Sequence, residues 1–344
     1  MRAAVARDKR ELTVEQVARP EPGPGEARVR VEACGLCGTD LHLLNSGFAP
    51  GAVPGHEIAG RVDALGPGVT GFSLGDPVSV EPLRTCGVCE HCRAGRDSIC
   101  PELKLLGVHL PGGFAEHVVV PVHRLFRVPR DLDAKLAALA EPVAVVLHGL
   151  RRGGFDVRHR VLVLGAGAIG LLTVLAARAA GAKDVRLTAR HAHQAALGRD
   201  FGATGVLAES EVGLKGMMQL GKRAPADLVV ETIGGQADAL RGAAWALAPG
   251  GCISVLGVFT APIALDGYPL LMKEGTLAWS NCYARDRERA DFEDAVRLID
   301  AERERLARLV THAVPLDRIG DAFAFASDKK AGAVKVTVLP HPTT

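Results

Sequence analysis

The first 150 residues consist of short segments in which apolar and polar side chains mix with a period of about two. The alternation is clearest at 27–31 (Ala-Arg-Val-Arg-Val), and further short runs follow at 115–120 and 125–128. Turn residues separate these runs at 22–25, 66–68 and 111–113. Short strands joined by tight turns predict a compact, irregular β-barrel over residues 1–150.

The pattern changes after Gly153 and Gly154. A continuous apolar run lies at 161–164, and a helical stretch at 168–180 follows it. Further short strands are predicted at 185–188, 228–230 and 252–256. Short buried strands that alternate with helices are typical of a parallel, doubly wound α/β sheet. We therefore expect such a domain over residues 151–280.

A third segment begins near residue 281. It predicts one charged helix over 285–310, then a final helix and a strand at 333–338.

Composition narrows the class of protein. Apolar residues make up 48% of the chain and charged residues 23%, and the formal net charge is +2. This balance is typical of a soluble globular protein and predicts no nucleic-acid or membrane partner. No run reaches the roughly 18 apolar residues of a membrane span, and the first residues lack the apolar core of a signal peptide. We expect a cytoplasmic protein with reduced thiols.

Half of the eight cysteines lie between residues 86 and 100, with the spacing C-x2-C-x2-C-x7-C: Cys86, Cys89, Cys92 and Cys100. In a reducing compartment, such a cluster indicates metal ligands. Four thiolates close a tetrahedral zinc site and leave no position for a reactant, which favours a structural role. An iron–sulfur cluster is the alternative, although the ferredoxin motif has three residues before its last cysteine and this chain has seven.

A second set of candidate ligands includes Cys37, His56, Glu57 and Glu141. One cysteine and one histidine are too few to close a zinc site. With a carboxylate they form a three-ligand site that has one open position, which is the arrangement of a catalytic zinc. Glu141 alone is equally well explained as a charge at a helix N-terminus. Only the cysteine, the histidine and a carboxylate taken together indicate a catalytic zinc site.

Together these motifs resemble the zinc-dependent medium-chain alcohol dehydrogenase family, in its branch of polyol, threonine and sugar-alcohol dehydrogenases. The matching pieces, in family order, are GLCGTDLH at 35–42, GHE at 55–57, the four-cysteine lobe, GGFAE at 112–116, Glu-Pro at 141–142 and a glycine motif at 165–170. The resemblance implies a GroES-like barrel as the catalytic domain (1–150), a Rossmann domain (151–280) and a C-terminal segment (281–344) that completes the catalytic domain.

The resemblance also implies roles for the second set of ligands. Cys37, His56 and Glu141 bind catalytic zinc, and Glu57 lies beside the metal and enters its shell as water or substrate leaves. Whether Glu57, Glu141 or water completes the shell stays open. Asp40 orients His56 through a hydrogen bond that fixes the imidazole tautomer.

In the implied reaction, a hydride passes between a secondary alcohol and a nicotinamide cofactor while zinc polarises the reacting oxygen. Thr39 contacts that oxygen, and His42 is the outer end of a proton relay. A carboxylate at 141, where ethanol-type members carry cysteine, favours a polyol, sugar alcohol or amino alcohol. The alternatives are an enzyme for simple alcohols and ketones that uses NAD, and a non-enzymatic zinc- and nucleotide-binding protein.

The nucleotide site is predicted by VLVLGAGAIG at 161–170, a G-x-G-x-x-G turn between a buried strand and a helix. The glycines permit a tight turn and a close approach of pyrophosphate to the helix N-terminus. The candidate cofactor-binding residues are Gly165, Gly167, Ala168, Ile169 and Gly170 in this turn, and Ile233 and Leu256 after later strands.

The choice between NAD and NADP depends on the end of the second Rossmann strand. An acidic residue there binds the ribose hydroxyls of NAD. This chain has Ala189 at that position, followed by Arg190 and His191, and Asp184 stands at the opposite end of the strand. The guanidinium of Arg190 suits a 2′-phosphate. We therefore predict NADP.

The family resemblance further implies a homodimer or homotetramer, with residues 276–283 as a contact. Candidates for lining the substrate pocket are Leu43, Phe48, His109, Trp279 and Tyr283.

Overall fold

The alternating segment near residue 30 forms β3 (Glu26–Gly35), the strand that organises the first sheet of this computed structural model. Val29 and Val31 are fully buried, whereas Arg30 between them is exposed. One edge of β3 pairs antiparallel with β4 (Glu57–Leu65). The other edge pairs antiparallel with β8 (His117–Pro121) and then with β17 (Lys335–Leu339).

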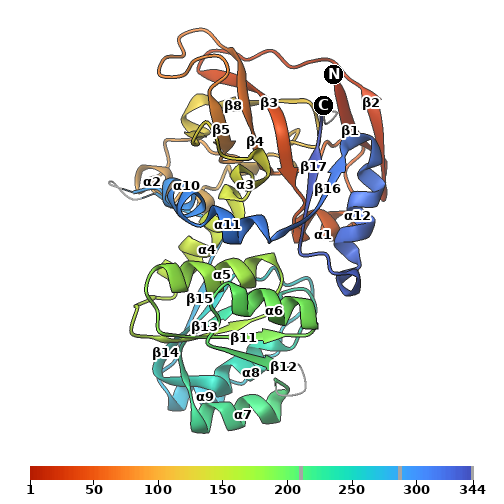
Figure 1. Cartoon of the computed structure of the whole chain (residues 1–344). Helices are drawn as coiled ribbons and strands as arrows, with labels where there is room; N and C mark the ends of the chain where they lie inside the picture. The colour runs from red at the N-terminus through yellow and green to blue at the C-terminus, as the bar shows by residue number, and fades with distance from the viewer. Residues whose placement is uncertain (209–211, 286–288, 342–344) are drawn as a thin grey trace. The chain divides into compact units, whose positions relative to one another are not determined.

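The sheet has seven strands, and six of them follow the order β16-β17-β3-β4-β5-β9, with β8 added at β3. The structure describes residues 1–208, 212–285 and 289–341 (Figure 1). Further elements in the first part of the chain are β1 (Arg2–Asp8), β2 (Glu11–Gln16), α1 (Gly38–Ser46), β5 (Pro77–Val80), β6 (Leu83–Arg84), α2 (Glu90–Arg93), η1 (Asp97–Ile99), β7 (Lys104–Leu105), η2 (Val122–Arg124), β9 (Leu125–Arg127), α3 (Ala134–Ala137) and α4 (Ala140–Arg152).

The C-terminal segment joins this sheet through β17. The expected single helix over 285–310 is wrong: the structure has α10 (Asp291–Ala301) and α11 (Arg303–Ala307), and residues 286–288 lie outside the described ranges. Val310 instead begins β16 (Val310–Pro315), because it pairs in parallel with β17. The predicted final helix is α12 (Ile319–Ser327), flanked by η4 (Leu316–Arg318) and η5 (Lys329–Ala331).

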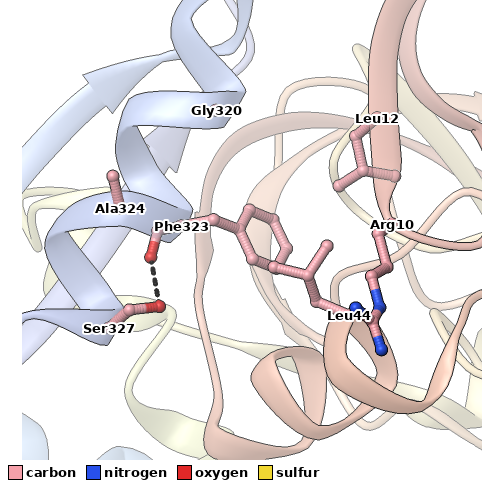
Figure 2. Close-up of a pocket in the computed structure, with 7 residues that line it drawn as sticks. All are labelled: Arg10, Leu12, Leu44, Gly320, Phe323, Ala324 and Ser327. Carbon is pink, nitrogen blue, oxygen red and sulfur yellow. Dashed lines mark hydrogen bonds between the residues drawn. The ribbon is translucent and has the colours of Figure 1, made fainter.

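A groove of about 250 Å³ lies between α12, α1 and β2. Figure 2 shows the side chains that line it. The ring of Phe323 points from α12 toward Leu12 of β2 and Leu44 of α1. On α12 itself, the Ser327 hydroxyl donates to the carbonyl of Phe323 at 2.8 Å. These apolar contacts hold α1, which carries several of the predicted site residues, against the C-terminal helix.

The apolar run at 161–164 and the strands predicted after it belong to a second sheet with the order β12-β11-β10-β13-β14-β15, in which all pairs are parallel. β10 (Arg160–Leu164) lies in its interior with Val161 to Val163 fully buried. The order reverses between β10 and β13, which creates the crevice where doubly wound sheets bind nucleotides. The other elements are α5 (Ala168–Ala179), β11 (Asp184–Ala189), α6 (Ala192–Asp200), β12 (Gly205–Ala208), α7 (Leu214–Arg223), β13 (Ala226–Glu231), α8 (Ala239–Ala246), β14 (Leu247–Val255), α9 (Gly267–Met272) and β15 (Thr276–Trp279).

The chain divides into two units, which we call the barrel unit (Met1–Glu141 and the described residues from Ala284) and the sheet unit (Pro142–Tyr283). The first boundary between these units follows Glu141, near the start of α4. The second follows Tyr283. Within the described ranges, no helix combines the length and apolarity needed to cross a membrane.

Asp227→Asn should lower the unfolding free energy of the sheet unit by about 1 kcal/mol at pH 7. The hydrogen-bonded Arg160 lowers the pKa of Asp227 from 3.8 to about 2. Between the folded pKa of about 2 and the ordinary value of 3.8, the folded state therefore binds fewer protons than the unfolded state. The stabilisation is present above about pH 4 and is lost as pH falls through the folded pKa. Thermal unfolding of both proteins between pH 7 and pH 3 measures this difference. A difference that stays constant over the range would contradict the assignment.

Candidate active site and metal centres

The four cysteines of the lobe (residues 85–100) converge on one point. Their Sγ atoms all lie within 4.8 Å of one another, with separations of 3.5 Å for Cys89–Cys92, 3.6 Å for Cys86–Cys100 and 3.9 Å for Cys86–Cys92. Zinc–sulfur bonds of about 2.3 Å in a tetrahedron place sulfur atoms about 3.8 Å apart. A disulfide would need about 2.05 Å. This donor set fits a closed zinc site.

Backbone N–H groups donate hydrogen bonds to two of these sulfur atoms. The N–H of Cys89 donates to Cys86 Sγ at 3.4 Å, and the N–H of Cys92 donates to Cys89 Sγ at 3.4 Å. Backbone donation from Val88 and Cys89 lowers the pKa of Cys86 to about 7, whereas burial raises the pKa of Cys92 to about 12. Turns that aim N–H groups at sulfur stabilise the thiolate form that binds metal.

The second predicted donor set also converges. Cys37, His56 and Glu57 each present a ligand atom, and these atoms lie within 4.8 Å of one another. Cys37 is the N-cap of α1, and Glu57 begins β4, paired with Gly35 at the end of β3. A Cβ at Gly35 would lie 2.0 Å from Glu57 Oε2, so the glycine makes room for this carboxylate. Antiparallel pairing of β3 and β4 thus brings Cys37, which follows β3, close to His56 and Glu57 at the start of β4.

His56 lies among negative groups. It is 3% exposed, and although burial would lower its pKa, the charges of Asp40 and Cys37 raise it well above the usual value. Asp40 Oδ2 accepts the N–H of Cys37 at 2.9 Å, while its Oδ1 lies 3.8 Å from His56 Nδ1. Neither Oδ1 nor Nδ1 has another hydrogen-bond partner. The 3.8 Å separation is longer than a hydrogen bond, so the predicted hydrogen bond between Asp40 and His56 is not formed in this structure, although the two side chains are neighbours.

Glu141, the second residue of α4, is 6% exposed. Burial raises its pKa to about 7, against the attraction of His56 and with repulsion from Glu57 added. It therefore lies within electrostatic range of the donor set, but the described atoms within 4.8 Å of one another belong to Cys37, His56 and Glu57. Burial also raises the pKa of Asp40. A cluster of buried acids with raised pKa values fits a divalent cation, which lowers such values again.

The two predicted relay residues lie on α1. Thr39 Oγ1 is 3.7 Å from Cys37 Sγ, which places this hydroxyl beside the donor set. His42 follows one turn further along the helix, where its carbonyl accepts the hydroxyl of Ser46 at 2.9 Å.

The predicted phosphate-binding turn joins β10 to α5. Gly165 has a φ of 100°, and its N–H donates to Thr188 Oγ1 of β11 at 2.8 Å. A Cβ at Gly170 would lie 1.8 Å from the carbonyl oxygen of Gly165, so only glycine fits there. Gly167 is the N-cap of α5, which leaves the N–H groups of Ala168 and its neighbour Ile169 in the first helical turn, where a phosphate binds.

β11 ends at Ala189, which is 8% exposed; Arg190 follows and is exposed, and His191 is the N-cap of α6. Asp184 begins the strand and accepts the hydroxyl of Thr204, so it lies at the other end, as predicted. A cavity of about 310 Å³ opens where β10, β11 and β13 end; its lining includes Leu164, Thr188, Ile233, Asp238, Arg241 and Gly242.

The two remaining cofactor-binding candidates lie in the sheet unit. Ile233 is 48% exposed, and its N–H donates to Glu231 Oε1 at 2.7 Å; Leu256 lies against Gly149 of α4.

Among the residues predicted to line the substrate pocket, Phe48 is in the barrel core, edge-on to Phe323 at 6.3 Å between ring centroids. Trp279 is 49% exposed on β15.

Two sequence-family models match the chain: the alcohol dehydrogenase GroES-like domain at residues 23–130 and the zinc-binding dehydrogenase at 168–301. L-threonine 3-dehydrogenase of Xanthomonas axonopodis pv. citri (strain 306) is 32% identical over 97% of this chain and 98% of its own length.

The chain belongs to the zinc-dependent medium-chain alcohol dehydrogenase family.

Solved structures agree with this membership. A Sinorhizobium meliloti 1021 protein, described as a zinc-binding dehydrogenase and solved bound to NADP, matches with a TM-score of 0.90, 32% identity and coverage of 98% of this chain and 99% of that one. Galactitol-1-phosphate dehydrogenase from Escherichia coli matches with a TM-score of 0.91, 28% identity and coverage of 99% and 100%. The protein is therefore a zinc-dependent oxidoreductase with a GroES-like barrel and a Rossmann sheet.

Sequence reasoning missed Lys335, which lies beside the donor set of Cys37, His56 and Glu57. Its ammonium is 3% exposed and lies 2.7 Å from both carboxylate oxygens of Glu57 and 3.3 Å from the carbonyl of Leu36. Although burial would lower the pKa of Lys335, the neighbouring Glu57 raises it. The signal available in the sequence was a lysine at the start of an otherwise apolar strand, where a charge needs a buried partner.

Lys335→Met should cost the dehydrogenase about 3–5 kcal/mol of unfolding free energy, because it leaves the buried carboxylate of Glu57 without a cation. Lys335→Arg should recover part of that loss. Urea unfolding measures the effect, with Lys330→Met as the control at an exposed lysine nearby. Equal stability of the Lys335→Met and Lys330→Met proteins would contradict the pairing.

Proposed function

We propose that this enzyme oxidises a secondary alcohol, such as a polyol, a sugar alcohol or an amino alcohol, and passes the hydride to NADP, or runs the reverse reduction. The observation that carries the proposal is the convergence of Cys37, His56 and Glu57 in the barrel unit, beside the buried acids Asp40 and Glu141. Relatives named L-threonine 3-dehydrogenase and galactitol-1-phosphate dehydrogenase act on substrates of this general kind, which supports the class of alcohol.

We further propose two zinc ions per chain. Cys37 and His56 hold the catalytic ion, with Glu141 or Glu57 as the carboxylate that completes its shell. The lobe cysteines hold the second ion and have a structural role. The donor sets support this assignment, because the first mixes sulfur, nitrogen and oxygen and leaves a position open, whereas the second is closed.

A bound catalytic zinc supplies Lewis acidity toward the reacting oxygen. The chain's own groups supply the rest of the chemistry. Thr39 Oγ1, beside Cys37, accepts the proton of the substrate hydroxyl and passes its own toward His42, which exchanges it with solvent. Asp40 Oδ1 lies 3.8 Å from His56 Nδ1, where its charge favours this orientation of the imidazole, and Lys335 pairs with Glu57 beside the donor set.

NADP as the cofactor is supported by the end of β11. Between Asp184 and Asp200 the sequence has no acidic residue that would bind the ribose hydroxyls of NAD or repel a 2′-phosphate. Arg190 stands directly after the strand, where a planar guanidinium pairs with phosphate. The related Sinorhizobium meliloti protein was solved with NADP.

We also propose a homodimer or homotetramer in the cytoplasm. β15 is the edge strand of the Rossmann sheet, and Trp279 together with Tyr268, Leu271 and Met272 exposes apolar surface near it. Unpaired strand edges of this kind favour association with a second copy. The free thiols of all eight cysteines fit a reducing compartment.

Cys37→Ala or His56→Ala should abolish turnover in a protein that stays folded, and Glu141→Ala should weaken the catalytic metal while the lobe stays filled. Cys89→Ala should chiefly lower stability, because a structural site contributes its binding free energy to folding. Metal analysis, circular dichroism and turnover on a panel of polyols separate these effects. Full activity in a folded Cys37→Ala protein, or two tightly held zinc ions in Glu141→Ala, would overturn the corresponding assignment.

Arg190→Ala should weaken NADP(H) binding roughly ten- to hundred-fold, which is the value of a charge-assisted phosphate contact, and leave NAD(H) binding nearly unchanged. Titration of cofactor fluorescence measures both affinities. Arg199→Ala, at the exposed far end of α6, is the matched control. A wild-type preference for NAD would show the cofactor proposal to be wrong.

A further inference from the structure

A buried arginine outside the active site anchors the four-cysteine lobe. Arg124, the last residue of η2, is 2% exposed. Its Nη2 lies 2.8 Å from Asp97 Oδ2 and donates to Thr85 Oγ1 at 2.9 Å, and its Nη1 donates to Glu81 Oε1. Glu81 and Asp97 are themselves buried, at 4% and 8% exposed. One guanidinium thus connects Glu81 and Thr85, on either side of β6, with Asp97 of η1.

The partners of Arg124 lie at the two ends of the lobe. Thr85 directly precedes Cys86, and Asp97 lies three residues before Cys100. Arg124 therefore holds both chain ends that enter the cluster.

A second arginine fixes the outer side of the lobe. Arg285 Nη2 lies 2.6 Å from Glu81 Oε2, and the N–H of Arg285 donates to the carbonyl of Gly95 at 2.8 Å. A Cβ at Gly95, which has a φ of 70°, would lie 1.6 Å from the carbonyl oxygen of Arg285. The lobe is thus in close contact with the chain where it returns to the barrel unit.

We propose that Arg124 is a positioning residue that controls how long the four-cysteine lobe retains its metal. The proposal rests on the structural zinc proposed above. Arg124 holds Thr85, next to Cys86, and Asp97, three residues before Cys100, in place. Without the guanidinium, Asp97 becomes an unpaired buried carboxylate and Glu81 keeps only Arg285 as a partner, and the repulsion between these acids and the nearby thiolates opens the lobe.

Partners that orient metal ligands typically contribute about 10- to 100-fold in metal affinity, so Arg124→Met should release zinc from the lobe about 10- to 100-fold faster. A chromogenic zinc chelator added to the holoenzyme measures the release rate. Arg127→Met, on the next strand, is the control, because the Arg127 side chain is 55% exposed and pairs with Asp76. Arg124→Lys, which keeps the charge but loses the planar fork, should release zinc at an intermediate rate.

Thr85→Val removes the hydroxyl through which Arg124 holds the residue next to Cys86, in a protein that keeps every ion pair. With cobalt in the lobe, the thiolate-to-cobalt absorption should shift in Thr85→Val and in Arg124→Met but stay unchanged in Arg127→Met. Wild-type release rates and an unshifted spectrum in both variants would overturn the role of Arg124 and leave the structural zinc intact. A wild-type lobe that binds neither zinc nor cobalt through thiolates would overturn the proposed structural site itself. If Arg124→Met fails to fold, Arg124→Lys and Thr85→Val decide the question by the same two readouts.

Discussion

Buried negative charge around His56 is the constraint on which the barrel unit depends. Asp40, Glu57 and Glu141 are all at most 6% exposed, and Cys37 adds a sulfur donor to the same pocket. An ionised carboxylate without a partner in such a place costs several kcal/mol. Lys335 offsets the charge of Glu57, and the proposed catalytic zinc would offset the remaining charge. The same buried acids therefore account both for the negative charge around His56 and for the expected affinity of this site for a metal ion.

The parts that could be predicted from the sequence depend on short-range geometry. Spacings of two residues between lobe cysteines force a turn that gathers sulfur atoms, and the observed Sγ distances follow from that. The glycines at 165 and 170 are required by a close backbone approach, which a strand–turn–helix pattern signals. Cys37 and His56 are linked by the pairing of two neighbouring strands, which the alternation at 27–31 already indicates.

The parts that could not be predicted depend on contacts between distant segments. Lys335 meets Glu57 across 278 positions, and nothing local marks it as a partner of an acid. In the sequence, Arg124 is one charged residue in a turn, and only the folded structure shows its contact with the lobe. Likewise, the charged stretch after 290 has helical periodicity up to its end, but pairing with β17 makes Val310 a strand residue. Tertiary pairing overrides local propensity in each case.

Anomalous diffraction at the zinc absorption edge tests the central claim most directly, because it locates metal without relying on activity. The account predicts two peaks per chain, one enclosed by Cys86, Cys89, Cys92 and Cys100 and one between Cys37 and His56. A single peak in the lobe, with the buried acids around His56 balanced by protons alone, would contradict the account.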